Sequence, residues 1–340
     1  MADRPGASAG PRPRILNAEP DRYSARARAA LEEVAEVTEQ ALDHEGLLKA
    51  IAAYDALIVR RGHRIDTEVL DAAPRLRAIA TATTGLDHID LKAARDRGIE
   101  VLSLRGENEF LRGAVATAEH TWALLLALVR KIPQASAAVR RGEWDRDAFR
   151  GRELEGKRLG VVGLGRIGER VARYGQAFGM EVRAFDRYRE DWPDDLIRMP
   201  TLETLLETSD VLTLHVPSNE DTRGMIGRRQ LSRLPGGAVI VNTARGAVVD
   251  GAAVADFVKS GRLAGAAVDV IEGETAGGVG SDMLLLAARD LDQILVTPHI
   301  GSATAESVER TELFMARKLA DFLKRSIEVP RGAENGPGDR

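Results

Sequence analysis

The stretch that decides the fold runs from Lys157 to Asp186 and reads KRLGVVGLGRIGERVARYGQAFGMEVRAFD. It begins with a short apolar strand pattern, Leu159–Val162, which leads into a glycine-rich turn. A helical pattern follows the turn, and a second strand pattern, Glu181–Phe185, ends the stretch. This order of elements predicts a parallel β-α-β unit.

The turn carries glycines in the G-x-G-x-x-G spacing, at Gly163, Gly165 and Gly168. Gly163 permits the tight turn, Gly165 lets a pyrophosphate approach the backbone, and Gly168 lets the helix pack close to the sheet. The N–H groups at the start of the helix and the positive end of its dipole favour a phosphate there. The turn therefore predicts a dinucleotide-binding site.

Asp186 ends the second strand, 18 residues after Gly168. Dinucleotide sites of this type carry a carboxylate near that position, where it binds the ribose hydroxyls. A carboxylate would repel a 2′-phosphate, so Asp186 favours NAD. Arg187 and Arg189 follow directly and could bind a 2′-phosphate, so NADP is the alternative.

The bulk composition excludes several classes of protein. A chain of 340 residues suits two domains, each with its own core. A net charge of −4 argues against nucleic acid or an anionic membrane as partner. The absence of cysteine excludes disulfides, thiolate zinc sites and a cysteine nucleophile, and we expect no metal site. With no membrane-length apolar run and no signal-peptide core, the expected location is cytoplasmic.

Residues 14–104 alternate between strand and helix patterns, which predicts a small parallel α/β domain. The expected strands are Arg14–Ala18, Ala56–Val59, Leu76–Thr81 and Glu100–Leu104, and the expected helices are Ala25–Leu42, Thr67–Ala73 and Leu91–Gly98.

Two loops of this first domain are candidate ligand loops. One is a basic cluster that begins with Arg60 and Arg61 directly after a strand, and the other contains Thr84 and Gly85, with free backbone amides. Ligands gather at the carboxyl ends of strands in open α/β sheets. A solvated surface loop is the alternative interpretation of the basic cluster.

The rest of the chain predicts a second α/β domain around the β-α-β unit. Ala116–Ile132 is strongly apolar and predicts a long helix that is buried on most faces. Beyond Asp186 the expected strands are Asp210–Leu214, Ala238–Asn242, Gly265–Val268 and Gln293–Val296, and the expected helical segments are Leu202–Thr208, Gln230–Leu234, Gly251–Ser260 and Ala305–Lys324.

Polar residues of three kinds, Arg245, Glu274 and His299, follow three of these strands. We expect them at one edge of the sheet, where the cofactor binds. A guanidinium can bind a carboxylate through two hydrogen bonds, and an imidazole can transfer a proton near neutral pH. With a nicotinamide cofactor, the set predicts hydride transfer to a 2-keto acid. Arg245 would bind the substrate, His299 would protonate its carbonyl oxygen, and Glu274 would orient His299.

Over Arg14–Ser326 the chain resembles the D-isomer-specific 2-hydroxyacid dehydrogenase family, which contains D-3-phosphoglycerate dehydrogenase. The motifs that carry the resemblance are KRLGVVGLGRIGERVA, LHVPSNEDT, VNTARGAVVD, AGAAVDVIEGE and TPHIGSAT, which begin at Lys157, Leu214, Val241, Ala264 and Thr297.

The resemblance implies two doubly wound α/β domains with parallel sheets. A Rossmann NAD domain, residues 116–301, would be inserted into a flavodoxin-like substrate domain made of residues 13–115 and 302–328. The hinges would lie near Ala116 and Gly301, and residues 1–12 and 329–340 are expected to be disordered tails. The helix Ala116–Ile132 matches the element that forms dimers in the family, so a homodimer is expected.

The resemblance also implies roles for individual residues. Arg245, Glu274 and His299 would be catalytic, Asp186 would bind the adenine ribose, and Asp269 would bind the nicotinamide amide. Further residues implied at the NAD site are Gly163, Gly165, Arg166, Ile167, Gly168, His215, Val216, Pro217, Thr222, Thr243, Ala244 and Gly301. Residues implied at the substrate are Arg60, Arg61, Thr84, Gly85, Arg245 and His299.

The chain departs from the family pattern at two places. Thr275 stands where the family usually has a proline after the catalytic glutamate, and a glycine-rich insertion follows. Glu272 is therefore an alternative partner for His299, although the spacing from Asp269 favours Glu274. Arg61 stands where the family usually has a small hydroxyl residue. Its charge could favour a second anionic group such as a phosphate, or it could be surface charge.

We therefore predict an NAD-dependent dehydrogenase of D-2-hydroxyacids and 2-keto acids, with phosphorylated ones such as 3-phosphoglycerate among the candidates. One alternative is a dehydrogenase for a phosphonate or another anionic analogue. The other is an NADH-sensing binding protein, because the resemblance extends to transcriptional corepressors.

Overall fold

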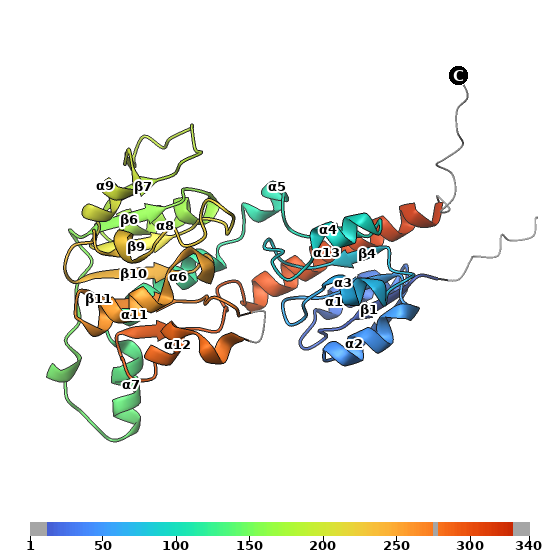
Figure 1. Cartoon of the computed structure of the whole chain (residues 1–340), viewed down its shortest axis with the longest axis horizontal. Helices are drawn as coiled ribbons and strands as arrows, with labels where there is room; N and C mark the ends of the chain where they lie inside the picture. The colour runs from blue at the N-terminus through green and yellow to red at the C-terminus, as the bar shows by residue number, and fades with distance from the viewer. Residues whose placement is uncertain (1–11, 275–277, 329–340) are drawn as a thin grey trace, which may run out of the picture. The chain divides into compact units, whose positions relative to one another are not determined.

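The computed structural model describes residues 12–274 and 278–328, and the chain divides into two compact units. Of the described residues, one unit contains 12–111 and 305–328, and the other contains those between 112 and 304 (Figure 1). These divisions fall a few residues from the expected hinges at Ala116 and Gly301. The expected disordered tails lie outside the described residues, apart from Arg12.

The first unit is built on a five-stranded parallel sheet with the strand order β2-β1-β3-β4-β5. Its elements are β1 (Arg14–Asn17), α1 (Ala25–Glu32), β2 (Glu36–Glu39), α2 (His44–Ala50), η1 (Ile51–Ala53), β3 (Ala56–Ile58), α3 (Thr67–Asp71), β4 (Ala78–Ala80), α4 (Leu91–Asp96), β5 (Glu100–Leu102), α5 (Asn108–Leu111) and α13 (Ala305–Glu328).

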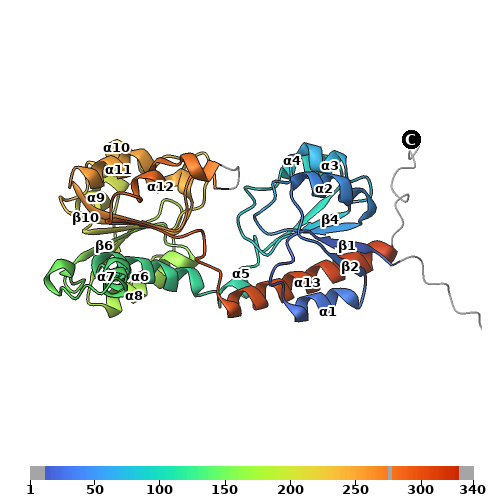
Figure 2. The same cartoon turned by 90° about the horizontal axis from the view of Figure 1, so that it is seen from below.

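Helices cover both faces of this sheet. Figure 2 shows α1 and α13 on one face and α2, α3 and α4 on the other. Leu16, Leu57 and Ile79, from three neighbouring strands, pack into the core beneath the second set of helices. Because both faces are covered, β3 and β4 are buried along their whole length, which explains their uninterrupted apolar sequences.

One predicted helix of the first unit is wrong. The pattern at Ala25–Leu42 suggested a single helix, but α1 ends at Glu32 and Glu36–Glu39 forms the edge strand β2, paired with β1. The apolar spacing before the break fits a helix, so the local pattern does not reveal the strand. Pairing with β1 outweighs the local preference, as tertiary context often does. The helix α2 that follows was not predicted.

The second unit is built on a seven-stranded parallel sheet with the order β12-β11-β10-β9-β6-β7-β8. Its elements are α6 (Ala116–Val129), α7 (Ile132–Arg140), η2 (Asp147–Phe149), β6 (Arg158–Val162), α8 (Arg166–Ala177), β7 (Glu181–Phe185), β8 (Ile197–Arg198), α9 (Leu202–Glu207), β9 (Val211–Leu214), α10 (Arg228–Leu231), β10 (Ala238–Asn242), η3 (Gly246–Val248), α11 (Gly251–Lys259), β11 (Leu263–Val268), η4 (Gly278–Ser281), α12 (Met283–Ala287) and β12 (Ile294–Val296).

This sheet also lies between two layers of helices, with α6 and α8 on one face and α9 to α12 on the other (Figure 2). The central strand β10 shows why. Val239 and Val241 pack into the core beneath α6 and α8, whereas Ile240 packs into the core on the opposite face. The two-domain α/β fold with parallel sheets, expected from the sequence, is therefore confirmed.

The predicted long helix Ala116–Ile132 ends early. The helix α6 stops at Val129, and Lys131, with a left-handed φ of 52°, separates it from α7. Within the described ranges, no single helix is long and apolar enough to cross a membrane; residues 108–129 and 132–140 pass that test only as a pair, bent by 63°.

Candidate active site

The glycine-rich turn after β6 is shaped by close backbone contacts. Gly163 has a positive φ of 86°, and a Cβ there would lie 2.7 Å from the carbonyl oxygen of His215. A Cβ on Gly168 would lie 2.1 Å from the carbonyl oxygen of Gly163. Only glycine fits at either position, so the turn and the first turn of α8 approach β9 as closely as the sequence motif predicts.

Gly165 differs from these two glycines because the space beside it is open. A Cβ built there meets no atom within 4 Å. Gly165 is also the N-cap of α8, and no side chain caps the amides of that helix. Arg166 and Ile167 form its first turn. Uncapped amides beside open space fit the pyrophosphate of a dinucleotide.

Asp186 lies at the end of β7 and already binds the backbone. Its carboxylate accepts N–H groups from Leu164 at 2.8 Å, Tyr188 at 2.9 Å and Arg189 at 3.0 Å. Arg189 donates to the carbonyl oxygen of Leu164 and lies 3.4 Å from the Glu169 carboxylate. The charge of Arg189 is thus balanced within the turn, which favours NAD over NADP at this position.

The loop after β9 carries His215, Val216 and Pro217. His215 Nε2 lies 2.9 Å from Thr213 Oγ1. Although part of the residue is exposed, the protein encloses the imidazole, and this desolvation lowers the pKa of His215 to about 3. His215 is therefore neutral at physiological pH. Thr222 donates its hydroxyl to the carbonyl oxygen of Pro217 at 2.6 Å and so stabilises the loop.

Asp269 is buried at the end of β11, with 2% of its surface exposed. It accepts the Thr297 hydroxyl at 2.6 Å and the N–H groups of Ile300 at 2.8 Å and Gly301 at 2.7 Å. His120 Nε2 lies 3.1 Å from the same carboxylate. Asp269 therefore fixes the segment on either side of His299. His120 was not among the predicted site residues, because a histidine in a largely apolar helix has no distinctive spacing.

His299 and Glu274 form a direct pair. Nδ1 of His299 lies 2.7 Å from Oε1 of Glu274, and the two side chains are 23% and 18% exposed. A carboxylate only accepts hydrogen bonds, so Nδ1 carries the proton and Nε2 is the ring nitrogen that can exchange a proton with a ligand. The backbone of His299 is left-handed, with φ of 54°, and its N–H donates to the carbonyl oxygen of Asp269 at 2.9 Å.

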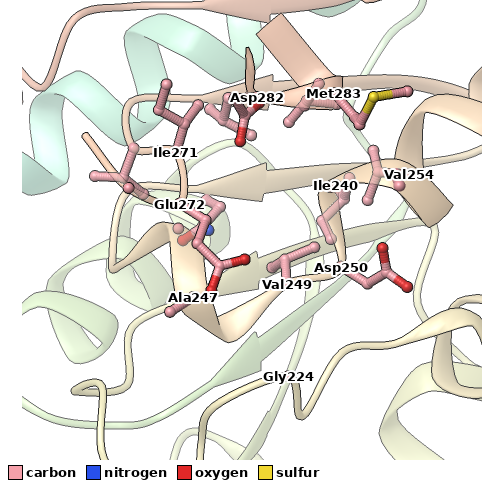
Figure 3. A pocket seen from close by; sticks show the side chains of 18 of the residues that line it. Gly224, Ile240, Ala247, Val249, Asp250, Val254, Ile271, Glu272, Asp282 and Met283 are labelled. Carbon is pink, nitrogen blue, oxygen red and sulfur yellow. The ribbon is translucent and has the colours of Figure 1, made fainter. Parts of the chain in front are cut away.

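Glu272, the alternative partner of His299, faces elsewhere. It lies 3.4 Å from Arg223, and both side chains are 65% exposed. It lines a cavity of about 520 Å³ together with apolar residues such as Ile240, Val254 and Met283 (Figure 3). Arg245, Glu274 and His299 do not line this cavity.

The loop after β10 positions Arg245. The buried side chain of Asn242 accepts the N–H of Ala244 at 3.0 Å and donates to the carbonyl oxygen of Arg245 at 2.9 Å. The Thr243 hydroxyl lies 2.7 Å from that of Thr121 on α6. Asn242 was not among the predicted site residues, because an amide at the end of a strand has no distinctive spacing.

The second unit thus contains every predicted catalytic and NAD-site residue. All of them lie in the turn before α8, in the first turn of α8, at the end of β7, or in the loops after β9 to β12 at the carboxyl edge of the sheet. Among the described residues, no group of three or more His, Asp or Glu side chains is placed to hold a metal ion.

Four predicted substrate residues lie in the first unit. Arg60 and Arg61 follow β3, and Thr84 and Gly85 lie in the loop after β4. Arg60 is already engaged, because it donates to Glu312 at 2.5 Å and to the carbonyl oxygen of Asp21 at 3.0 Å.

Comparison with known proteins places this geometry in a family. The model for the NAD binding domain of D-isomer specific 2-hydroxyacid dehydrogenases matches residues 122–301. A D-3-phosphoglycerate dehydrogenase from Archaeoglobus fulgidus is 39% identical over 285 residues, which cover 83% of this chain and 52% of that protein. The chain therefore spans about half the length of that relative.

Two further relatives are similar over nearly their whole length. A hydroxypyruvate reductase from Thermotoga maritima is 37% identical over 284 residues, covering 84% of this chain and 90% of that protein. The crystal structure of a D-lactate dehydrogenase from Aquifex aeolicus, complexed with NAD and lactic acid, superposes with a TM-score of 0.79 at 30% identity. That match covers 96% of this chain and 100% of the other.

The open space beside Gly165 generates a prediction. Gly165→Val should abolish measurable NADH binding, because the side chain would fill the space in front of the α8 amides, while thermal stability stays close to that of the wild type. NADH fluorescence and a melting curve provide the two measurements. Gly227→Val is the matched control, since Gly227 caps α10 with nearly the same backbone angles. Unchanged NADH binding in Gly165→Val would refute this assignment.

Proposed function

The chain belongs to the D-isomer-specific 2-hydroxyacid dehydrogenase family, and on that premise we propose that it catalyses NAD-dependent hydride transfer between the nicotinamide and C2 of a D-2-hydroxyacid or 2-keto acid. The observation that carries the proposal is the 2.7 Å pair of His299 and Glu274 in the NAD-binding unit. It provides an acid–base group whose tautomer is fixed by a carboxylate.

In the proposed mechanism Arg245, Glu274 and His299 have separate tasks. Arg245 binds the substrate carboxylate through two hydrogen bonds, which orients C2. His299 donates a proton from Nε2 to the carbonyl oxygen in the reductive direction and takes it back in the oxidative direction. Glu274 accepts from Nδ1 and stabilises the imidazolium. Bound NAD supplies the acceptor or donor of hydride at C4 of its nicotinamide.

We further propose how the chain binds its cofactor. The amides at the start of α8 bind the pyrophosphate, and Asp186 binds the adenine ribose. Neutral His215 and the loops that contain Pro217 and Thr243 line the cofactor. For Asp269 we propose a positioning task in addition to its expected contact with the nicotinamide amide, because three donors already occupy its carboxylate.

We also propose that the chain forms a homodimer. Three large apolar residues that follow α6 are exposed: Ile132 at 55%, Val139 at 52% and Trp144 at 89%. All three lie within 15 residues of the end of the helix that matches the dimer-forming element of the family. Exposed apolar residues of this kind support contact with a second copy.

The functional test is the consumption of NADH and NADPH over a panel of 2-keto acids, with hydroxypyruvate, glyoxylate, pyruvate, phosphohydroxypyruvate and phosphonopyruvate. We expect turnover of at least one compound, faster with NADH than with NADPH. If no compound reacts while NADH still binds, the enzyme proposal fails in favour of an NADH-binding sensor.

Replacing Glu274 tests the proposed catalytic pair. Glu274→Gln should lower kcat by about 10²-fold or more, because a neutral amide cannot stabilise the imidazolium. Steady-state kinetics with the best substrate of the panel measure the change. Glu272→Gln is the matched control, and kcat should stay within about twofold, since its ion pair is exposed. A large loss in the control and none in Glu274→Gln would assign the role to Glu272.

The dimer proposal predicts a change of mass in solution. Trp144→Glu should convert the dimer to a monomer in light scattering after size exclusion, because it places a charge in the apolar contact. Ile197→Glu, a change at an exposed apolar residue on β8, is the control and should leave the mass unchanged. A wild-type protein that is monomeric at micromolar concentration would contradict the proposal.

A further inference from the structure

The sheet of the first unit has a point where ligands are expected. In the order β2-β1-β3-β4-β5, the chain moves to one side of β1 and then to the other, so the loops after β1 and β3 diverge. In open α/β sheets, the crevice at such a switch point binds ligands. The basic loop Arg60–Arg64 follows β3 at this point, and Glu19 follows β1.

The carboxylate of Glu19 binds the loop that follows β3 at this point. It accepts the backbone N–H groups of Arg60 at 3.0 Å, Gly62 at 3.1 Å and His63 at 3.3 Å. Backbone N–H groups that converge on one point form a site suited to an anion. Here the anion belongs to the chain itself.

A second carboxylate neutralises the guanidinium of the same loop. Glu312 on α13 is 3% exposed and lies 2.5 Å from Nη2 of Arg60. Its other oxygen accepts the N–H of Ser24 at 2.7 Å, which fixes the carboxylate in place. The backbone amides and the Arg60 side chain are therefore both engaged by acidic residues of the same unit.

These contacts bear on the charge of the substrate. From the sequence alone, the basic loop favours a second anionic group on the substrate, such as a phosphate. A phosphate at the switch point would meet the Glu19 carboxylate in place of amide donors, and like charges in such contact select strongly against a ligand.

We propose that Glu19 is a specificity-determining residue that restricts this enzyme to 2-keto acids with a single negative charge and excludes phosphorylated ones. The proposal rests on the dehydrogenase function proposed above and on the loop Arg60–Arg64 contacting the substrate. It deepens that function by naming the substrate class: short 2-keto acids such as hydroxypyruvate, without a phosphate.

Glu19→Gln tests the role of the charge while keeping the loop. The amide oxygen of glutamine can still accept the N–H groups of Arg60, Gly62 and His63, which all converge on Oε1 in the wild type. The measurement is kcat/KM with NADH for hydroxypyruvate and for phosphohydroxypyruvate. The ratio of the two values is independent of any loss of folded protein.

We expect the wild type to prefer hydroxypyruvate, and Glu19→Gln to shift the ratio toward phosphohydroxypyruvate by tenfold or more, with little change in KM for hydroxypyruvate. The shift should shrink at high salt, because it arises from charge. Glu33→Gln, which removes an exposed carboxylate of the same unit, is the matched control and should leave the ratio unchanged.

Two results would overturn the specificity proposal alone. One is a wild type that turns over phosphohydroxypyruvate as efficiently as hydroxypyruvate, and the other is a ratio that does not move in Glu19→Gln. Both results require measurable turnover, so they leave the dehydrogenase function intact. An enzyme that turns over neither compound, nor any other member of the panel, would instead refute the function on which the proposal depends.

Discussion

The arrangement of the segment that carries His299 depends on the buried carboxylate of Asp269. His299 has a left-handed backbone, which costs a residue other than glycine roughly 1–2 kcal/mol. Asp269 binds the Thr297 hydroxyl and the N–H groups of Ile300 and Gly301, and hydrogen bonds to a charged group contribute about 1.5–3 kcal/mol each. These contacts outweigh the backbone cost. They hold the backbone on either side of His299, whose Nδ1 lies 2.7 Å from Oε1 of Glu274.

The same physical device recurs at the carboxyl edges of both sheets. Asp186, Asp269 and Glu19 each accept two or three backbone N–H groups from loops that follow strands. Parallel strands end with unpaired amides at one edge, and a carboxylate is the simplest group that satisfies several of them. Where no carboxylate caps the amides, as at Gly165, the edge is open to a ligand. The amides that the chain leaves uncapped therefore determine where a ligand can bind.

Much of the fold and of the candidate site could be predicted from local sequence. The remainder depends on contacts between residues that lie far apart in the sequence. The turn at Gly163–Gly168 and the strand ends have short-range signatures, so the α/β fold was predicted correctly. The candidate cofactor residues also lie at the carboxyl edge of one sheet, as expected. The spacing from Asp269 favoured Glu274 over Glu272 as the partner of His299, and the structure pairs His299 with Glu274. His120, Glu19 and Glu312 act on residues 41 to 252 positions away in the sequence, and no local pattern reports such contacts. The roles of the individual site residues stay predictions.

The discontinuity of the first unit has a consequence for biosynthesis. Its last helix, α13, contacts α1 and contributes Glu312 and Lys318 to the unit, yet about 190 residues of the second unit are translated between Leu111 and α13. At ribosomal speed that interval lasts roughly 10–40 s. Throughout it, the apolar surface that Leu319 and Leu323 later bury has no covering helix. The second unit is contiguous and can fold as it emerges from the ribosome. Its synthesis starts later than that of the first unit, but its fold can be completed earlier.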